Sequence, residues 1–181
     1  NPRGATELQM ELLHKYVPNE LLDKVQICTS IPGKVPLDPN KVNILWQKNS
    51  WDQPNLQNFF RNKKRHDEYD WYVFNSHWNF EKFRYFFQLP EDKCMVIKNG
   101  VDHFPKRKIY KRGEPIKIIH HCTPWRGLNV LLLAMQYVQS KNVTLDVYSS
   151  NQIYGSEFAE KANNDTRALF DQAKKLSNVN Y

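Results

Sequence analysis

The feature that most constrains the fold is a strand–helix–strand pattern in residues 115–155. Residues 116–121 form a short apolar run rich in β-branched side chains, and apolar residues alternate with polar ones at 143–148. Between them, residues 129–138 have the apolar spacing of a buried helix. A helix that connects two strands in this way makes their pairing parallel, with a right-handed crossover. The pattern therefore predicts an α/β fold.

Polar loops follow both strands of this unit, at residues 120–127 and 149–155. Ligands of open parallel sheets bind at the carboxyl ends of the strands. Arg126 and Gly127 stand where the helix is expected to begin. Free N–H groups at a helix N-terminus favour an anion, a glycine lets the backbone approach it, and a guanidinium can bind two of its oxygens. The pair is a candidate phosphate site, although the spacing fits equally well an arginine that only caps a surface loop.

Strands and helices alternate along the rest of the chain, which favours two parallel-sheet domains. Further strands are expected at 25–28, 42–46, 71–74 and 94–97, and helices from Thr6 and at 54–65, 77–87 and 166–176. Residues 103–115 are basic and flanked by proline and glycine, so they predict a linker between domains at 1–102 and 116–181. No strand precedes the first loop, and residues 178–181 resemble the start of another strand. We therefore expect a piece of a larger protein, with both domains incomplete.

Composition limits the partners without choosing among them. The 181 residues carry a net charge of +7, which permits nucleic acid, an anionic membrane or a phosphorylated small molecule. No apolar run approaches the ~20 residues of a membrane span, and no signal peptide opens the sequence. The three cysteines are far apart, so we expect reduced, buried thiols in a cytoplasmic protein, with no disulfide framework and no zinc site.

Several motifs resemble those of family 4 (group 1) glycosyltransferases, which are retaining enzymes with two Rossmann-like domains, the GT-B fold. The most specific is Val96–Asp102 (VIKNGVD), which resembles the family's I-x-N-G-V-D signature before the interdomain hinge. Residues 4–7 resemble its glycine loop, and Tyr72–Trp78 resembles a strand and turn of its acceptor-side domain. Residues 116–127 and 145–155 resemble the first two strands and loops of its donor domain. The resemblance covers nearly the whole chain but lacks the family's first strand and the C-terminal half of the donor domain.

The resemblance implies transfer of a sugar, with retention, from a nucleotide-diphosphate sugar to a glycan or lipid-linked acceptor, as in polysaccharide biosynthesis. The leaving group is a diphosphate, so stabilisation of charge on its oxygens matters most. The family's Glu, seven residues, Glu motif would lie beyond Tyr181, so this chain alone is expected to be inactive. No cofactor or metal ion is expected, and no residue is assigned to the catalytic step.

The implied roles can be grouped by position. The donor diphosphate is assigned to Arg126, Gly127, Thr123, Gly4 and Ala5; the nucleotide side to Ser149, Ser150 and Asn151; possible acceptor contacts to Gln47, Ser50 and His77; and the hinge to Asn99, Gly100 and Asp102. His121 is a candidate replacement for the arginine of the Gly-Arg pair that is common in the family, because His120-His121 stands in its place.

Other functions compete with this one. The net charge and the aromatic residues beside basic ones fit a nucleic-acid-binding protein, but the basic residues are scattered over two runs and no aromatic follows an RNA-binding sheet signature. Nucleic acid is therefore not favoured as a partner. Sugar epimerases and phosphorylases share the two-domain architecture, and a non-catalytic remnant is a further alternative. The basic runs 61–65 and 106–112 could rest on the inner face of an anionic membrane.

Overall fold

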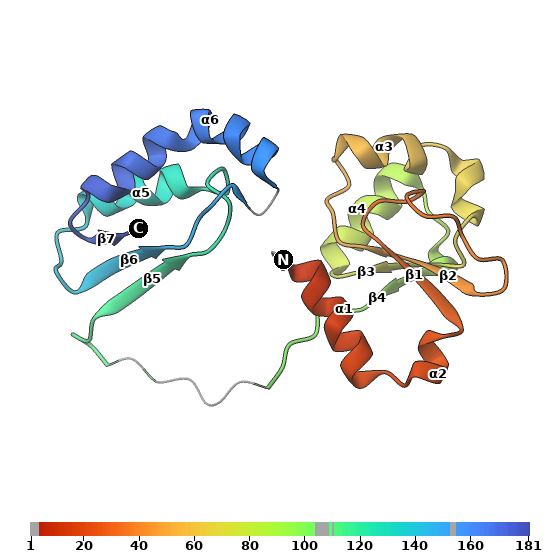
Figure 1. Ribbon diagram of the computed structural model, residues 1–181. Coiled ribbons are helices and arrows are strands. Elements are labelled where there is room, and N and C mark those ends of the chain that lie inside the picture. Colours follow the sequence, from red (N-terminus) through yellow and green to blue (C-terminus); the bar gives the residue numbers. More distant parts are fainter. Residues whose placement is uncertain (1–3, 104–108, 110, 153–154) are drawn as a thin grey trace. The chain divides into compact units, whose positions relative to one another are not determined.

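A computed structural model of the chain describes residues 4–103, 109, 111–152 and 155–181 (Figure 1). The chain divides into two compact units, Asn1–His103 and Phe104–Tyr181. Each unit has its own parallel sheet and its own core. Part of the predicted linker, residues 104–108 and 110, lies outside the described residues.

The N-terminal unit is built on a four-stranded sheet with the order β1-β2-β3-β4. Its strands are β1 (Val25–Thr29), β2 (Val42–Gln47), β3 (Trp71–Phe74) and β4 (Cys94–Val96). All three pairings are parallel, and the register places Leu45 beside Cys28 and Tyr72. The carboxyl ends of the four strands consequently lie at one edge of the sheet.

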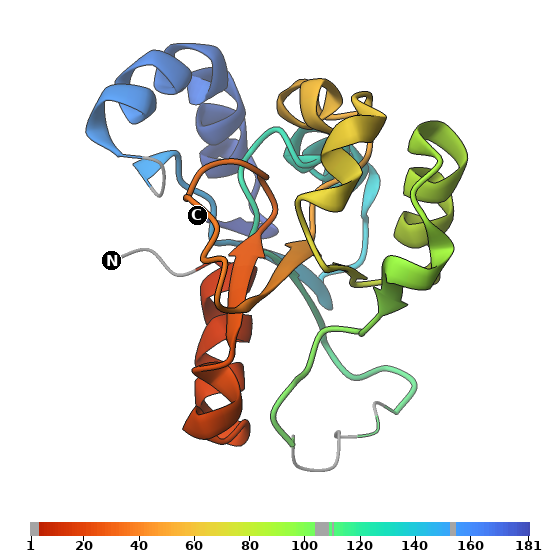
Figure 2. The ribbon, with the colours of Figure 1, turned by 90° about the vertical axis from the view of Figure 1, so that its right-hand side faces the viewer.

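Helices lie on both faces of this sheet. They are α1 (Ala5–Tyr16), α2 (Asn19–Leu22), α3 (Pro54–Phe60) and α4 (His77–Phe87), with 3₁₀ turns η1 (Lys63–Asp67) and η2 (Glu91–Lys93). Figure 1 shows α3 and α4 on one face of the sheet and α1 and α2 on the other, and Figure 2 shows the same separation from another direction.

The core between the sheet and helices α3 and α4 is largely aromatic. Phe60, Tyr72 and Phe83 are fully buried, and the rings of Phe60 and Phe83 meet edge to face with their centroids 4.8 Å apart. Such contacts add to the stabilisation that comes from burying apolar area. Not every aromatic of α4 lies in this core: Tyr85 is 78% exposed, and Phe86 stacks on Trp51 at the surface side of the helix.

The C-terminal unit has a three-stranded parallel sheet with the order β5-β6-β7. Its elements are β5 (Ile116–His120), α5 (Leu128–Tyr137), β6 (Val143–Val147), α6 (Ser156–Lys175) and β7 (Val179–Asn180). Both helices lie on the same face of this sheet (Figure 1). Leu132 of α5, Leu145 of β6 and Ala173 of α6 are fully buried in the core between them.

Two helix boundaries expected from the sequence are corrected. The helix expected at 54–65 ends at Phe60, because the side chain of Asn62 accepts a hydrogen bond from the Lys64 N–H (3.2 Å) and caps a 3₁₀ turn instead. Helix α6 begins at Ser156, ten residues before the expected start at Thr166. In the first half of α6, Ala159 is the buried apolar side chain among those that the structure describes. This half is therefore mostly polar, and a polar stretch of this kind resembles a loop in the sequence.

The cysteines are also less enclosed than expected. Cys122 is exposed, and Cys28 and Cys94 are only half-buried. Cys122 lies in the loop that follows β5, two residues beyond the end of the strand. The apolar residues before it had suggested a buried position.

Truncating Phe60 to alanine should destabilise the N-terminal unit strongly, because a fully buried ring would leave a cavity among the rings of Phe59, Phe83 and Phe87. We expect Phe60→Ala to lower the free energy of unfolding by about 3–5 kcal/mol in urea titrations. Tyr85→Ala, in the neighbouring helix α4, removes an exposed ring and should cost less than about 0.5 kcal/mol. Equal losses in the two variants would contradict the assignment of the core.

Candidate functional site

The loop between β5 and α5 turns sharply before the helix. The Arg126 N–H donates to the Thr123 carbonyl (2.9 Å), and the Leu128 N–H donates to the Pro124 carbonyl (3.3 Å). Gly127 then caps α5 with a φ of +88°, in the left-handed region. A Cβ at this position would meet no atom within 4 Å, so the backbone conformation alone favours glycine here.

Arg126 is exposed on this turn, directly before Gly127, the N-cap of α5. Its guanidinium makes no hydrogen bond or ion pair with any residue that the structure describes. The first turn of a helix presents backbone N–H groups without intrahelical partners and the positive end of the helix dipole. Arg126 and Gly127 thus combine a cation that is free among the described residues with a position suited to an anion, and their role toward a phosphate stays a prediction. Thr123, assigned to the same group, is buried beneath the turn.

The loop after β6 is fastened to its surroundings by side-chain hydrogen bonds. The Ser149 hydroxyl donates to the Cys122 carbonyl (2.6 Å), which joins this loop to the loop after β5. The Asn151 amide donates to the Thr166 hydroxyl (2.8 Å), which joins it to α6. Ser149 and Asn151 are buried, whereas Ser150 is exposed. The structure therefore brings the predicted diphosphate and nucleotide-side loops together at one edge of the sheet.

The two adjacent histidines at the end of β5 occupy different environments. His120 continues the strand alternation that places Ile118 toward the helices, and it is buried, while His121 is exposed. The Nε2 atom of His120 is enclosed and has no hydrogen-bond partner among the described residues. The resemblance assigned a candidate role only to His121. The period of two along the strand was the signal that could have separated them.

Substitutions at Gly127 test whether its conformation is needed. Gly127→Ala should lower the free energy of unfolding of the C-terminal unit by about 1–2 kcal/mol, because an L-residue is strained at positive φ. Gly127→Asn should cost less, because asparagine tolerates the left-handed region better than other L-residues. Urea unfolding of the two variants measures the difference. A smaller loss for alanine than for asparagine would contradict this account of the turn.

A chain of amide hydrogen bonds runs along the carboxyl edge of the N-terminal sheet. The Gln47 amide donates to the Ser30 carbonyl (3.0 Å) and accepts from the Asn49 N–H (2.8 Å). The Asn79 amide then donates to the Asn49 carbonyl (3.3 Å), and the Asn79 N–H donates to the Ser76 hydroxyl (3.1 Å). These bonds connect the loops after β1 and β2 with the start of α4.

The three residues predicted to contact an acceptor lie at this edge with different accessibility. Gln47 is fully buried and both ends of its amide are bonded, so a direct contact with a ligand would require those bonds to break. Ser50 is half-buried, and its carbonyl accepts from the Gln53 N–H (3.3 Å). His77 is the exposed first residue of α4. Their roles toward an acceptor stay predictions.

Helix α1 begins at the predicted glycine loop. Ala5 is its exposed first residue, and Gly4 is its N-cap. The Gly4 N–H donates to Glu7 Oε2 (2.9 Å), and a Cβ on Gly4 would come within 2.7 Å of that oxygen. The φ of Gly4 is −93°, so the close carboxylate, and not the backbone angle, favours glycine here.

The predicted hinge residues follow β4, and two of them are held by α1. The Gln9 amide both donates to the Gly100 carbonyl and accepts from the Gly100 N–H, each at 2.8 Å. Asp102 accepts from the Tyr16 hydroxyl (2.7 Å) and pairs with Lys15 (2.9 Å), and these contacts lower the pKa of the Asp102 carboxyl. Asn99, between them and β4, is exposed.

A lysine that the sequence analysis passed over lies at the same edge. The Nζ atom of Lys48 is shielded from solvent, 3.7 Å from the ring centroid of Trp46, and has no hydrogen-bond partner among the described residues. Trp46 Nε1 is likewise buried and without a partner there. Burial lowers the pKa of Lys48, and the charge of Glu7 opposes this only in part. Lys48 follows Trp46 by two residues, so the strand period could have placed the two on one face.

The buried ammonium of Lys48 should make stability depend on pH. Because the folded chain lowers its pKa, the unfolded chain binds more protons as the pH approaches the ordinary value of 10.5, and stability gains with rising pH. We expect the free energy of unfolding of the natural chain to rise relative to Lys48→Met between pH 8 and about 10.5, in urea titrations. Parallel pH profiles for the two proteins would show that Lys48 titrates as an exposed lysine.

Across the described part of the chain, no group of three or more histidine, cysteine, aspartate or glutamate side chains could hold a metal ion. The helices described here include none with the length and apolarity to cross a membrane.

Comparison with known proteins places the architecture. The chain matches no model of a protein family, and no curated protein matches it. Among solved structures, TarM, a glycosyltransferase of the GT-B type, is similar with a TM-score of 0.52 and 13% sequence identity. The chain has the GT-B fold. The similarity covers 90% of this chain and 33% of TarM, so the chain spans about a third of the length of that structure. A likeness at this level of identity shows the fold alone.

Proposed function

We propose that this chain belongs to a retaining glycosyltransferase of family 4, which transfers a sugar from a nucleotide-diphosphate sugar to a glycan or lipid-linked acceptor. The observation that carries the proposal is the exposed, unpaired guanidinium of Arg126 at the glycine-capped start of α5. It lies at the carboxyl edge of a parallel sheet, where ligands of open α/β sheets bind. The GT-B fold supports the class of reaction.

The chemistry assigned to this edge is stabilisation of a diphosphate leaving group. As the bond from the sugar to the diphosphate breaks, negative charge grows on the phosphate oxygens. Arg126 would bind two of these oxygens, the N–H groups of the first turn of α5 would bind others, and Thr123 would support the turn. Gly4 and Ala5, at the start of α1, keep the assignment to the diphosphate that the resemblance gives them. The proposal assigns the neutralisation of charge to these protein groups and invokes no metal ion or cofactor.

The remaining assignments follow the same reaction. Ser150 would face the nucleotide, with Ser149 and Asn151 holding its loop, and His121 would stand beside the phosphates. Ser50 and His77 would lie near the acceptor, and Gln47 would hold their loops in place. We further propose a cytoplasmic enzyme of polysaccharide biosynthesis at the inner face of an anionic membrane, where the exposed basic residues around Lys64 would contact phosphate headgroups.

Replacing Arg126 by alanine should weaken binding of pyrophosphate, UDP, GDP and ADP to the chain by roughly 10- to 100-fold, because a hydrogen-bonded charge is lost. Isothermal titration calorimetry on the full chain measures this. In an active enzyme that contains the chain, we expect Arg126→Ala to lower the turnover rate by an amount that corresponds to a loss of about 2–4 kcal/mol of transition-state stabilisation. Arg126→Lys should be intermediate, since it keeps the charge but loses the two-point geometry.

Arg112→Ala is the matched control, because it removes the same charge from an exposed position before β5. We expect it to leave binding within about twofold of the natural chain, as for an exposed charge that does not contact the ligand. Equal losses of affinity in the Arg126 and Arg112 variants would show that the effect comes from net charge alone. Unchanged binding in Arg126→Ala would remove Arg126 from the diphosphate site.

A further inference from the structure

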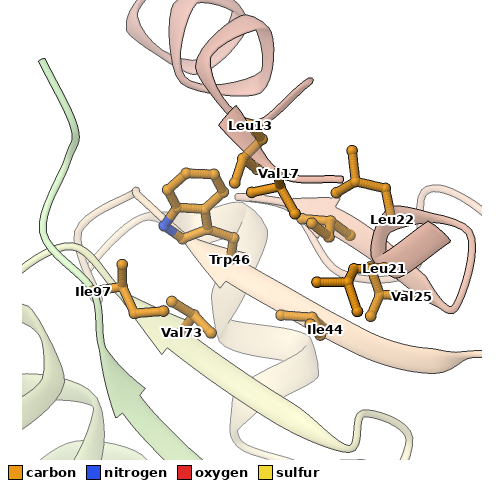
Figure 3. A pocket seen from close by; sticks show the side chains of 10 residues that line it. Leu13, Val17, Leu21, Leu22, Val25, Ile44, Trp46, Val73 and Ile97 are labelled. Atoms are coloured by element: carbon orange, nitrogen blue, oxygen red, sulfur yellow. The ribbon is translucent and has the colours of Figure 1, made fainter. Parts of the chain in front are cut away.

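An apolar cavity lies in the N-terminal unit between the sheet and helices α1 and α2. Its volume is about 240 Å³, and its walls are almost entirely apolar side chains from both helices, from β1, β2 and β3, and from Ile97 directly after β4. The residues that line it are Leu13, Val17, Leu21, Leu22, Val25, Ile27, Ile44, Trp46, Val73 and Ile97 (Figure 3). Apolar cavities of about 150 Å³ in other proteins stay dry and bind small hydrocarbons. This cavity is therefore suited to an aliphatic group.

The cavity has one polar end. Figure 3 shows the indole nitrogen of Trp46 on the side of the ring that faces away from Leu21, Leu22 and Val25. That nitrogen is buried and has no hydrogen-bond partner among the described residues. The ammonium of Lys48 lies 3.7 Å from the centroid of the same ring and also lacks a partner there. One indole thus lines the cavity and also contacts an unpaired cation.

Among the residues of this unit that the structure describes, none forms an ion pair with the charge at this end. Glu7 is the acidic group whose charge reaches Lys48, but its carboxylate is bonded to the Gly4 N–H and forms no ion pair with Lys48. Buried donors without acceptors are costly, so a site that retains them is expected to meet an acceptor in some bound state. An anion placed here would receive hydrogen bonds from an ammonium and an indole N–H.

We propose that this cavity binds an anionic amphiphile, with its aliphatic chain between α1 and the sheet and its phosphate group at Lys48 and Trp46. The apolar part extends from Trp46 toward the amino end of β2, and the phosphate lies at the carboxyl end, beside the loop after β2. Insofar as it identifies the acceptor as a lipid phosphate, the inference rests on the proposed function. Binding itself does not require transfer.

Titration of the full chain with alkyl phosphates tests this directly. With butyl, hexyl and octyl phosphate below their micelle concentrations, we expect affinity to rise roughly fourfold per methylene, the effect of removing a CH₂ from water. Inorganic phosphate and octanol should each bind at least tenfold more weakly than octyl phosphate. Affinity that does not depend on chain length would overturn the proposal, since it would leave only an exposed cation that attracts phosphate.

Two variants test the phosphate site and the apolar cavity separately. Lys48→Met should weaken binding of octyl phosphate at least tenfold, whereas Lys141→Met, which removes an exposed lysine from the C-terminal unit, should leave it unchanged. Val17→Phe places a ring in the cavity at the end of α1 and should abolish the dependence on chain length. Thermal unfolding of each variant verifies that it is folded. Equal binding of octyl phosphate by Lys48→Met and the natural chain would contradict the site.

A parallel titration with pyrophosphate distinguishes failure of this inference from failure of the proposed function. Binding of pyrophosphate that depends on Arg126, with no binding of octyl phosphate, would refute the amphiphile and retain the donor site. Binding of octyl phosphate that depends on Lys48, with no effect of Arg126 on pyrophosphate, would retain the amphiphile site and refute the donor site.

Discussion

Parallel pairing of every strand is the constraint on which the rest of this structure depends. Each of the five strand pairs is parallel, so the loops that follow the strands of a sheet all lie at one edge. The connections that return the chain to the opposite edge are mostly helices, and their N-termini start from the same loops. Polar loops and helix N-termini therefore meet at one edge of each unit, which is why parallel α/β sheets bind ligands there.

Such an edge works only if its loops keep their shape, and each unit meets this need with a different kind of hydrogen bond. In the C-terminal unit the Ser149 hydroxyl bonds to the Cys122 carbonyl across two loops. In the N-terminal unit the amides of Gln47 and Asn79 connect the loops after β1 and β2 with the start of α4. Buried hydroxyls and amides that are satisfied in this way hold loop geometry without contacting a ligand themselves. Several residues with polar side chains at strand ends thus support the edge, while Arg126, Ser150 and His77 remain exposed on it.

The two units differ in what they leave unsatisfied. The C-terminal unit presents an exposed arginine at a helix start, a position that suits a mobile anion from solvent. The N-terminal unit encloses an ammonium and an indole N–H beside an apolar cavity. Buried donors of this kind favour a ligand that brings its own apolar part, because the same contact that satisfies the donors also fills the cavity. The two proposals therefore concern ligands of different chemistry, one on each unit.

The order of strands and helices was predictable from the sequence because local periodicity governs it. The strand at Trp71–Phe74 and the helix at His77–Phe87 have the predicted bounds, because a short apolar run and the Ser76 cap of the helix both act within a few residues. The positive φ of Gly127 also agrees with a glycine placed directly before a helix. The start of α6 was missed because the first half of this helix buries almost no large apolar side chain. The end of α3 was missed because it depends on one capping side chain, that of Asn62.

By itself the sequence determined the fold class, an α/β protein with two parallel sheets, because it depends on patterns within a few residues. The tertiary structure decided which polar side chains at the strand ends are exposed and which are bonded or buried, as the contrast between His120 and His121 shows. It also placed Lys48 against Trp46 and left both without acceptors beside a cavity formed by six separate segments. Burial and hydrogen-bond satisfaction depend on residues that are distant in the chain, and no local pattern encodes them.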